Sequence, residues 1–148
     1  MMGFWRAGQK SGSKAKWTCA AAALAGLTGV SGILLAAAAA HSVPDPRLQT
    51  AANFLLLHAA AALAVCGLAA AIPRGGVLFL GAAGFFLSGS LIFGADLSTR
   101  AFAGTRLFPM AAPLGGSLLI AGWISVTLAA LTVFWQSGAW TPGQNIDD

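Results

Sequence analysis

His58 is the residue of this chain with the clearest capacity for site chemistry. It stands inside a long apolar stretch, where an ionisable side chain usually faces the protein interior and marks a functional site. A structural hypothesis competes with that reading: a neutral imidazole bonded to a serine or to a backbone carbonyl would lock helices together. We favour the structural role and keep a binding role as the alternative.

Metal and haem chemistry need further ligands, and the spacing does not supply them. Cys19 and His41 would lie on one helix, about 33 Å apart at 1.5 Å per residue, which excludes a Cys2His2 zinc site. His41 and His58 would differ in depth by about 12 Å, which argues against a shared haem. We therefore expect no metal and no cofactor, and we expect Cys19 and Cys66 to be small apolar packing residues.

A catalytic arrangement is also not expected. We place the nearest carboxylates, Asp45 and Asp96, in loops, so that no carboxylate relay crosses the apolar stretches. The chain has no phosphate-binding loop, HExxH motif or nucleophile elbow. The sequence predicts a protein that is not an enzyme and has no catalytic residues. An energy-coupled transporter is disfavoured on the same grounds.

Four apolar stretches must position these residues. The chain has 148 residues, of which 57% are hydrophobic and 8% charged, whereas soluble domains have about 25% charged residues. A membrane-spanning helix needs about 20 apolar residues, and short links make consecutive helices antiparallel. We predict an all-α membrane protein with four transmembrane helices in an up-down-up-down antiparallel bundle. The predicted helices are about 17–40, 50–72, 77–95 and 111–135.

Two polar tails flank the predicted transmembrane domain of residues 17–135. Residues 1–16 form a basic tail and residues 136–148 a polar one. Because Lys and Arg collect on the cytoplasmic side of membrane proteins, the basic tail and Arg74 favour both termini in the cytoplasm. A basic tail beside an apolar segment indicates contact with the lipid bilayer rather than with nucleic acid.

A cleaved signal peptide is the alternative for the first stretch. A basic start, an apolar run and Ala38-Ala39-Ala40 before His41 resemble a cleavage site, although the run is longer than usual. N-terminal sequencing distinguishes the two, because a mature chain beginning at His41 would contradict four helices.

Small residues are expected to bring the helices together, since close backbone approach replaces the hydrophobic effect within lipid. The expected packing positions are Gly26, Gly29, Gly32, Gly84, Gly115, Gly116 and Gly122. Counted along the predicted helices, His58 lies about 12 Å and Ser88 about 10 Å from the outer ends. We therefore predict a polar pocket in the outer half, formed by His58, Ser88, Ser90, Asn53 and His41.

Several short motifs occur in a familiar order. An alanine-rich run precedes His41, Gln49 to Phe54 precedes His58, the third stretch carries Phe86-Leu87-Ser88-Gly89-Ser90, and the fourth opens Ala112-Pro113-Leu114-Gly115-Gly116. Over about residues 20–135 the chain resembles the YgdD/YwdK-like family of small bacterial inner-membrane proteins, a domain family of unknown function. The resemblance implies four spans in a bacterial inner (plasma) membrane and no established activity. Phe54 and Ala112 stand where that family usually has Tyr and Thr.

Two functions remain open from the sequence. The leading hypothesis is a non-enzymatic subunit or accessory factor of a membrane assembly, because the chain has short tails and several stripes of small residues. The alternative is a binding or permeation module for a quinone or lipid that uses the pocket around His58. Oligomeric state does not follow from the sequence.

Overall fold

Four helices make up the fold. The computed structural model describes residues 2–72 and 75–137, with side chains between residues 12 and 136. The helices are α1 (Met2–His41), α2 (Pro46–Ala71), α3 (Gly76–Ala103) and α4 (Ala111–Ser137), and the described residues contain no strand. All four are long and apolar enough to cross a membrane. The chain is therefore a multi-pass membrane protein whose outer surface is suited to lipid.

Three helix boundaries differ from the expected ones. α1 begins at Met2, so the described part of the predicted 1–16 tail continues the first helix. α2 begins at Pro46 rather than at residue 50, and α3 continues beyond residue 95 to Ala103. The link at Pro73 and Arg74, and residues 138–148 of the predicted C-terminal tail, lie outside the described residues.

Capping explains why α2 starts early. The Asp45 side chain accepts a hydrogen bond from the Arg47 backbone N–H at 2.8 Å, which satisfies an amide without a partner inside the helix. Pro46 follows as the first helical residue, where its fixed φ suits the helix and its missing N–H costs nothing.

The ends of α3 are set by two glycines. Gly75, before the helix, has φ +82°, and Gly104, after it, has φ +68°. Both angles are in the left-handed region, which glycine adopts without a Cβ clash. The Gly104 N–H bonds to the Arg100 carbonyl at 3.2 Å and closes the last turn.

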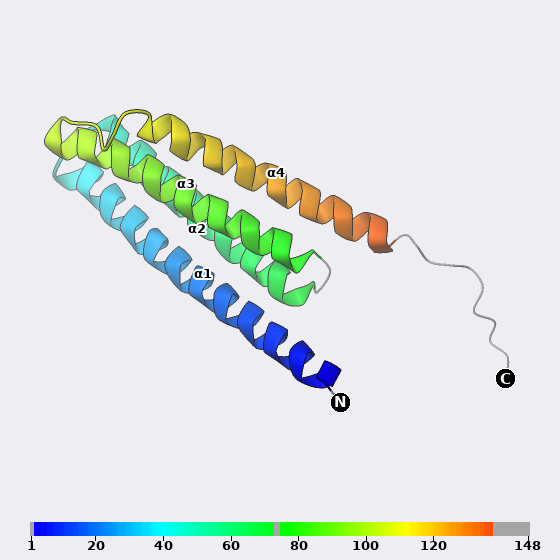
Figure 1. Ribbon diagram of the computed structural model, residues 1–148. Coiled ribbons are helices and arrows are strands. Elements are labelled where there is room, and N and C mark those ends of the chain that lie inside the picture. The colour runs from blue at the N-terminus through cyan, green and yellow to red at the C-terminus, as the bar shows by residue number, and fades with distance from the viewer. Residues whose placement is uncertain (1, 73–74, 138–148) are drawn as a thin grey trace, which may run out of the picture.

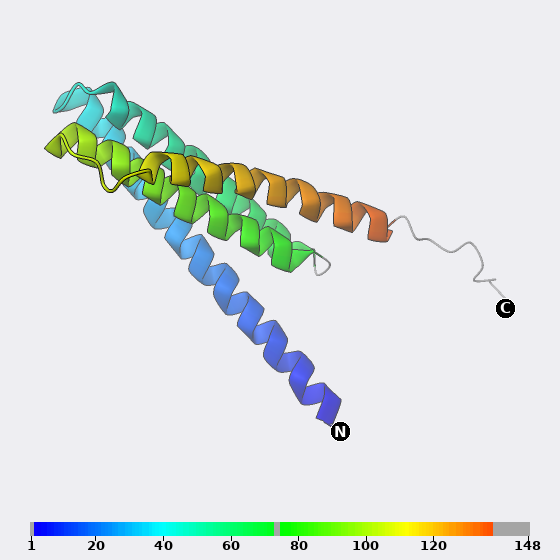
Figure 2. The same ribbon diagram turned by 45° about the horizontal axis from the view of Figure 1, so that its top comes forward.

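The helices are layered around a central pair. Consecutive helices run antiparallel, and α2 lies against α3 (Figure 1). α1 packs mainly on α2, and α4 packs along α3. Figure 2 shows α1 and α4 on different sides of this pair, with the first part of α1 diverging from the other helices. Within the described residues α1 and α4 share no extensive contact, so the four helices do not form a closed ring.

The buried core lies between α2 and α3. α2 contributes small side chains, among them Ala62, Cys66 and Ala69, and α3 contributes the large rings of Phe79 and Phe86. Small residues facing large ones allow helices to approach closely while filling the space between them.

Backbone contact is closest where α3 meets α4. A Cβ added at Gly115 would lie 2.7 Å from the Phe93 amide nitrogen and 2.9 Å from the Gly89 carbonyl oxygen. Gly32 and Gly122 are similarly restricted, by Leu56 and by the Phe86 ring, and Gly29 is in ordinary contact with Ala59. The other three expected packing glycines, Gly26, Gly84 and Gly116, would meet nothing within 4 Å. Gly89 and Gly94, which the sequence analysis did not select, are also in close contact.

Replacing Gly115 with alanine should destabilise the α3–α4 contact. The new methyl group would meet backbone atoms, which cannot rotate away, and we expect a loss of about 1–3 kcal/mol in the free energy of unfolding. Gly116→Ala is the matched control, since its Cβ meets no atom within 4 Å. Thermal unfolding in detergent, followed by circular dichroism, measures both. Equal unfolding temperatures for the two variants would contradict the close approach.

Candidate functional site

His58 lies at the middle of α2. It is twelve residues after Pro46, hence about 18 Å along the helix, whereas the sequence analysis placed it about 12 Å from the outer end. The difference arises because α2 begins four residues early. The side chain is buried, with 3% of its surface exposed.

A hydrogen bond and three aromatic rings hold the imidazole. Nδ1 lies 2.8 Å from the Phe54 carbonyl oxygen, one turn earlier. A carbonyl can only accept, so Nδ1–H donates, and in a neutral ring Nε2 is then the unprotonated nitrogen. The rings of Phe54, Phe86 and Trp123 have centroids 5.6, 5.6 and 6.4 Å from that of His58. This backbone bond is the kind of contact that the structural hypothesis requires.

The other residues of the predicted polar pocket lie elsewhere. Ser88 is exposed and lines a groove between α1 and α3, whereas Ser90 is fully buried. Asn53 is exposed and accepts a hydrogen bond from Gln49 of its own helix at 3.0 Å. His41 is exposed at the end of α1. Among the described residues, no hydrogen bond joins any two of the five.

Hydroxyl groups are satisfied within their own helices. Every helical serine and threonine from Thr18 to Thr132 donates to a carbonyl three or four residues earlier, at 2.7–3.3 Å. Side chains bonded in this way meet the requirement that lipid sets for polar groups. They also leave no chain of hydroxyls linking one helix to the next.

Asp96 is the buried polar residue that the sequence analysis missed. We placed it in a loop, but it lies in α3 and its side chain is completely buried. Its carboxylate pairs with Arg100 one turn later and accepts a hydrogen bond from the Leu107 amide at 2.9 Å. The spacing of four between Asp96 and Arg100, which suits an ion pair on one helix face, was the available signal.

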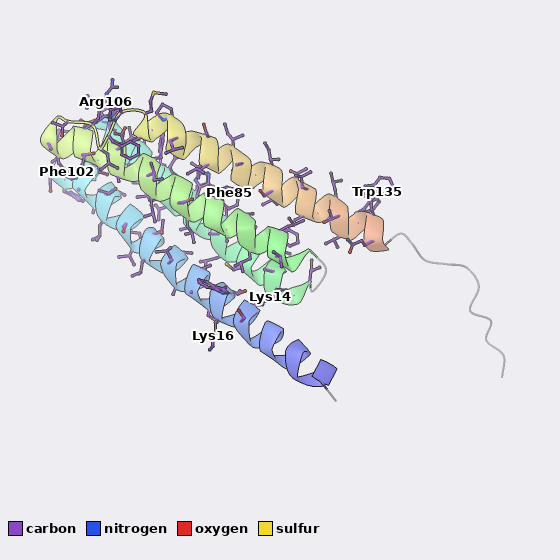
Figure 3. All side chains as sticks on the ribbon, in the orientation of Figure 1. Lys14, Lys16, Phe85, Phe102, Arg106 and Trp135 are labelled. Atoms are coloured by element: carbon purple, nitrogen blue, oxygen red, sulfur yellow. The ribbon has the colours of Figure 1, made fainter. Side chains whose placement is uncertain are left out.

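The Asp96–Arg100 ion pair lies where the link between α3 and α4 and the first turn of α2 both contact α3. Leu107 belongs to the link between α3 and α4, so its bond to Asp96 holds that link on α3. Arg47, in the first turn of α2, donates to the Arg100 carbonyl at 3.3 Å and forms an ion pair with Asp45 at 3.7 Å. The Arg100 Nε is buried without a partner among the described residues. Arg106 is exposed in the same link (Figure 3).

The described residues do not form a metal centre. Within residues 12–72 and 75–136, no three His, Cys, Asp or Glu side chains come together. Cys66 is buried between α2 and α3, and Cys19 is exposed on α1.

An apolar groove lies between α1 and α3. Its volume is about 500 Å³, within the range of small-molecule sites, and Trp17, Leu24, Leu80, Leu87, Ser88 and Leu91 are among its lining residues. His58 is not part of it.

His58→Ala should destabilise the protein, because it empties a space between three aromatic rings. We expect a loss of about 3 kcal/mol in the free energy of unfolding, as for other buried rings. His58→Phe keeps the ring volume and should recover most of that loss in thermal unfolding. If His58→Phe unfolded as readily as His58→Ala, the ring would not act mainly through packing.

Asp96→Ala should release the link between α3 and α4. The change leaves the Arg100 side chain without its carboxylate partner and frees the Leu107 amide, and breaking a buried pair costs about 3–5 kcal/mol. Trypsin should then cut after Arg106 faster than in the unchanged protein. Asp45→Ala is the control: it removes a helix cap, worth about 1 kcal/mol, and the exposed ion pair with Arg47, but it leaves the Asp96 bond to Leu107 intact and should leave the Arg106 site protected. Equal cleavage of the two variants would contradict the role of Asp96.

The comparisons with known proteins identify one family. A family model described as a protein of unknown function (DUF423) matches residues 35–116, which is more than half of the chain. The match contains all of α2 and α3, and with them His58, Asp96, Arg100 and Gly115. No curated protein and no solved structure matches the chain significantly. With this match the chain belongs to the DUF423 family of proteins of unknown function.

Proposed function

We propose that this protein is a non-enzymatic subunit or accessory factor of a membrane assembly. The observation that carries the proposal is the contrast in burial between the helices. Within one strongly apolar 18-residue segment of each helix, 39% of α2 and 44% of α3 is buried, against 17% of α1 and of α4. The outer helices therefore carry long apolar faces that nothing in the described chain covers.

Large side chains cover these outward faces. On α1, Leu27 and Ile33 are more than 60% exposed, and on α4 the same holds for Ile120 and Phe134. Phe85, Phe102 and Trp135 also project from the helices (Figure 3). Lipid covers such faces by default, and another membrane helix can replace lipid where packing is good. A role through contacts also agrees with the hydroxyl groups, which in the described helices bond within their own helix rather than from one helix to the next.

The same proposal includes the orientation and the membrane. We place both termini in the cytoplasm of a bacterium, with the protein in the inner membrane and within the YgdD/YwdK-like group. The charges support this orientation: Lys14 reaches Gly76, the first residue of α3, whereas the Asp96–Arg100 pair lies near the other end of that helix. In Asp96→Ala, trypsin added outside intact spheroplasts should cut after Arg106, and cleavage only in inverted vesicles would reverse the orientation.

A small-molecule module around His58 is the weaker alternative. The rings of Phe54, Phe86 and Trp123 surround the imidazole, and the groove of the described residues does not reach it. A quinone or lipid at His58 would have to displace one of these rings.

Site-specific photocrosslinking in native membranes tests the contact role. A benzoylphenylalanine at Ile33 probes the outer face of α1, and one at Ile120 probes that of α4. We expect one of these two positions to capture the same membrane protein in repeated preparations. The control position is Phe79, which is buried between α2 and α3 and should capture no partner. Adducts only with lipid, or only with a second copy of the chain, would contradict the proposal.

A further inference from the structure

The groove between α1 and α3 runs along both helices. Trp17, Ala20, Ala21 and Leu24 line its α1 side, so it follows two turns of that helix. On α3 the lining extends from Leu80 to Leu91, which is about 16 Å at 1.5 Å per residue. Small residues on both helices leave the space open, since a Cβ at Gly84 would meet nothing within 4 Å.

The chemistry of the lining selects an apolar occupant. Besides the Trp17 indole, Ser88 is the only polar side chain that lines the groove. Its hydroxyl already donates to the Gly84 carbonyl at 2.7 Å. A ligand with buried polar groups would find few partners there, and burying such groups unpaired is unfavourable. A hydrocarbon chain has no polar groups and therefore needs no hydrogen-bond partners.

A positive charge stands at one end of this groove. Lys14 precedes Trp17 by one turn, and its ammonium group reaches α3, where it occupies the space that a side chain at Gly76 would fill. Gly76 is the first residue of α3, four residues before Leu80 of the groove lining. Lys16, two residues later on α1, points away from the groove and is exposed (Figure 3). Tryptophan beside lysine is typical of the level at which headgroups lie.

From this arrangement we infer that the groove binds one acyl chain of an anionic phospholipid, whose phosphate pairs with Lys14. The hydrocarbon lies along Leu80, Gly84 and Leu91, and the headgroup lies at the basic end. This site does not depend on any protein partner, so it can hold even if the contact role fails.

Native mass spectrometry of the full-length protein in a mild detergent tests the site. The probes are phosphatidylglycerol and phosphatidylcholine with identical acyl chains, which differ only in headgroup charge. We expect the protein to retain phosphatidylglycerol preferentially. Lys14→Ala should lower this preference about fivefold, or about 1 kcal/mol at 1.4 kcal/mol per tenfold change, while Lys14→Arg should keep it.

Gly84→Leu tests the acyl part of the site. Its side chain would fill the groove and should reduce retention of both lipids. Gly81→Leu is the matched control, because Gly81 is exposed, meets no atom within 4 Å and does not line the groove. Circular dichroism checks that both glycine variants are folded. If Gly84→Leu does not fold, the lipid preference of Lys14→Ala and Lys14→Arg tests the site instead. Equal retention of the two lipids by the unchanged protein, or equal retention by the two glycine variants, would overturn the proposal.

Discussion

The rest of this structure depends on one constraint: polar groups that enter lipid must find partners within the chain. Helices satisfy their own backbone, and the serine and threonine hydroxyls from Thr18 to Thr132 satisfy themselves on the preceding turn. His58 follows the same rule with the Phe54 carbonyl. Most polar side chains of the helices are therefore internal to one element, and the packing between helices is left to small residues and aromatic rings.

Asp96 is where polar bonding instead joins separate elements. Its carboxylate holds an arginine of α3 and an amide of the following link, and that arginine's carbonyl accepts a hydrogen bond from α2. The start of α2, the end of α3 and the link that follows α3 thus meet at one end of the molecule. At the other end, Lys14 reaches from α1 to the start of α3. The two ends differ in chemistry: the first holds two Asp–Arg ion pairs beside the exposed Arg106, whereas the second holds lysines and no carboxylate among the described residues.

The number of helices could be predicted from the sequence, because length and hydropathy alone decide it. Two boundaries could not be predicted by hydropathy, although local signals existed. Asp45 before Pro46 is a cap followed by a first-turn proline, and Asp96 with Arg100 has ion-pair spacing. The sequence analysis instead took each charged residue as the end of an apolar stretch, so both local signals were missed. The predicted α2 and α3 were therefore too short, and His58 was predicted closer to one end of its helix than it is.

The site was harder to predict because sequence does not give the rotation of each helix about its axis. Ser88 and Ser90 are two residues apart, so they point about 200° from each other and cannot both face His58. Similarly, Gly115 and Gly116 are neighbours, but only Gly115 faces the backbone of α3. The aromatic rings around His58 come from three helices, and their meeting depends on register between helices rather than on any one stretch.

The length of the helices has a further consequence for the membrane itself. The shortest span has 26 residues, about 39 Å, whereas a typical hydrocarbon core is about 30 Å thick. This hydrophobic mismatch is relieved by tilting the helices, by thickening the bilayer nearby, or by letting helix ends enter the headgroup layer. Asp96 lies seven residues before the end of α3, about 10 Å. Bilayer thickness therefore decides whether the Asp96–Arg100 pair lies in hydrocarbon or at its hydrated boundary.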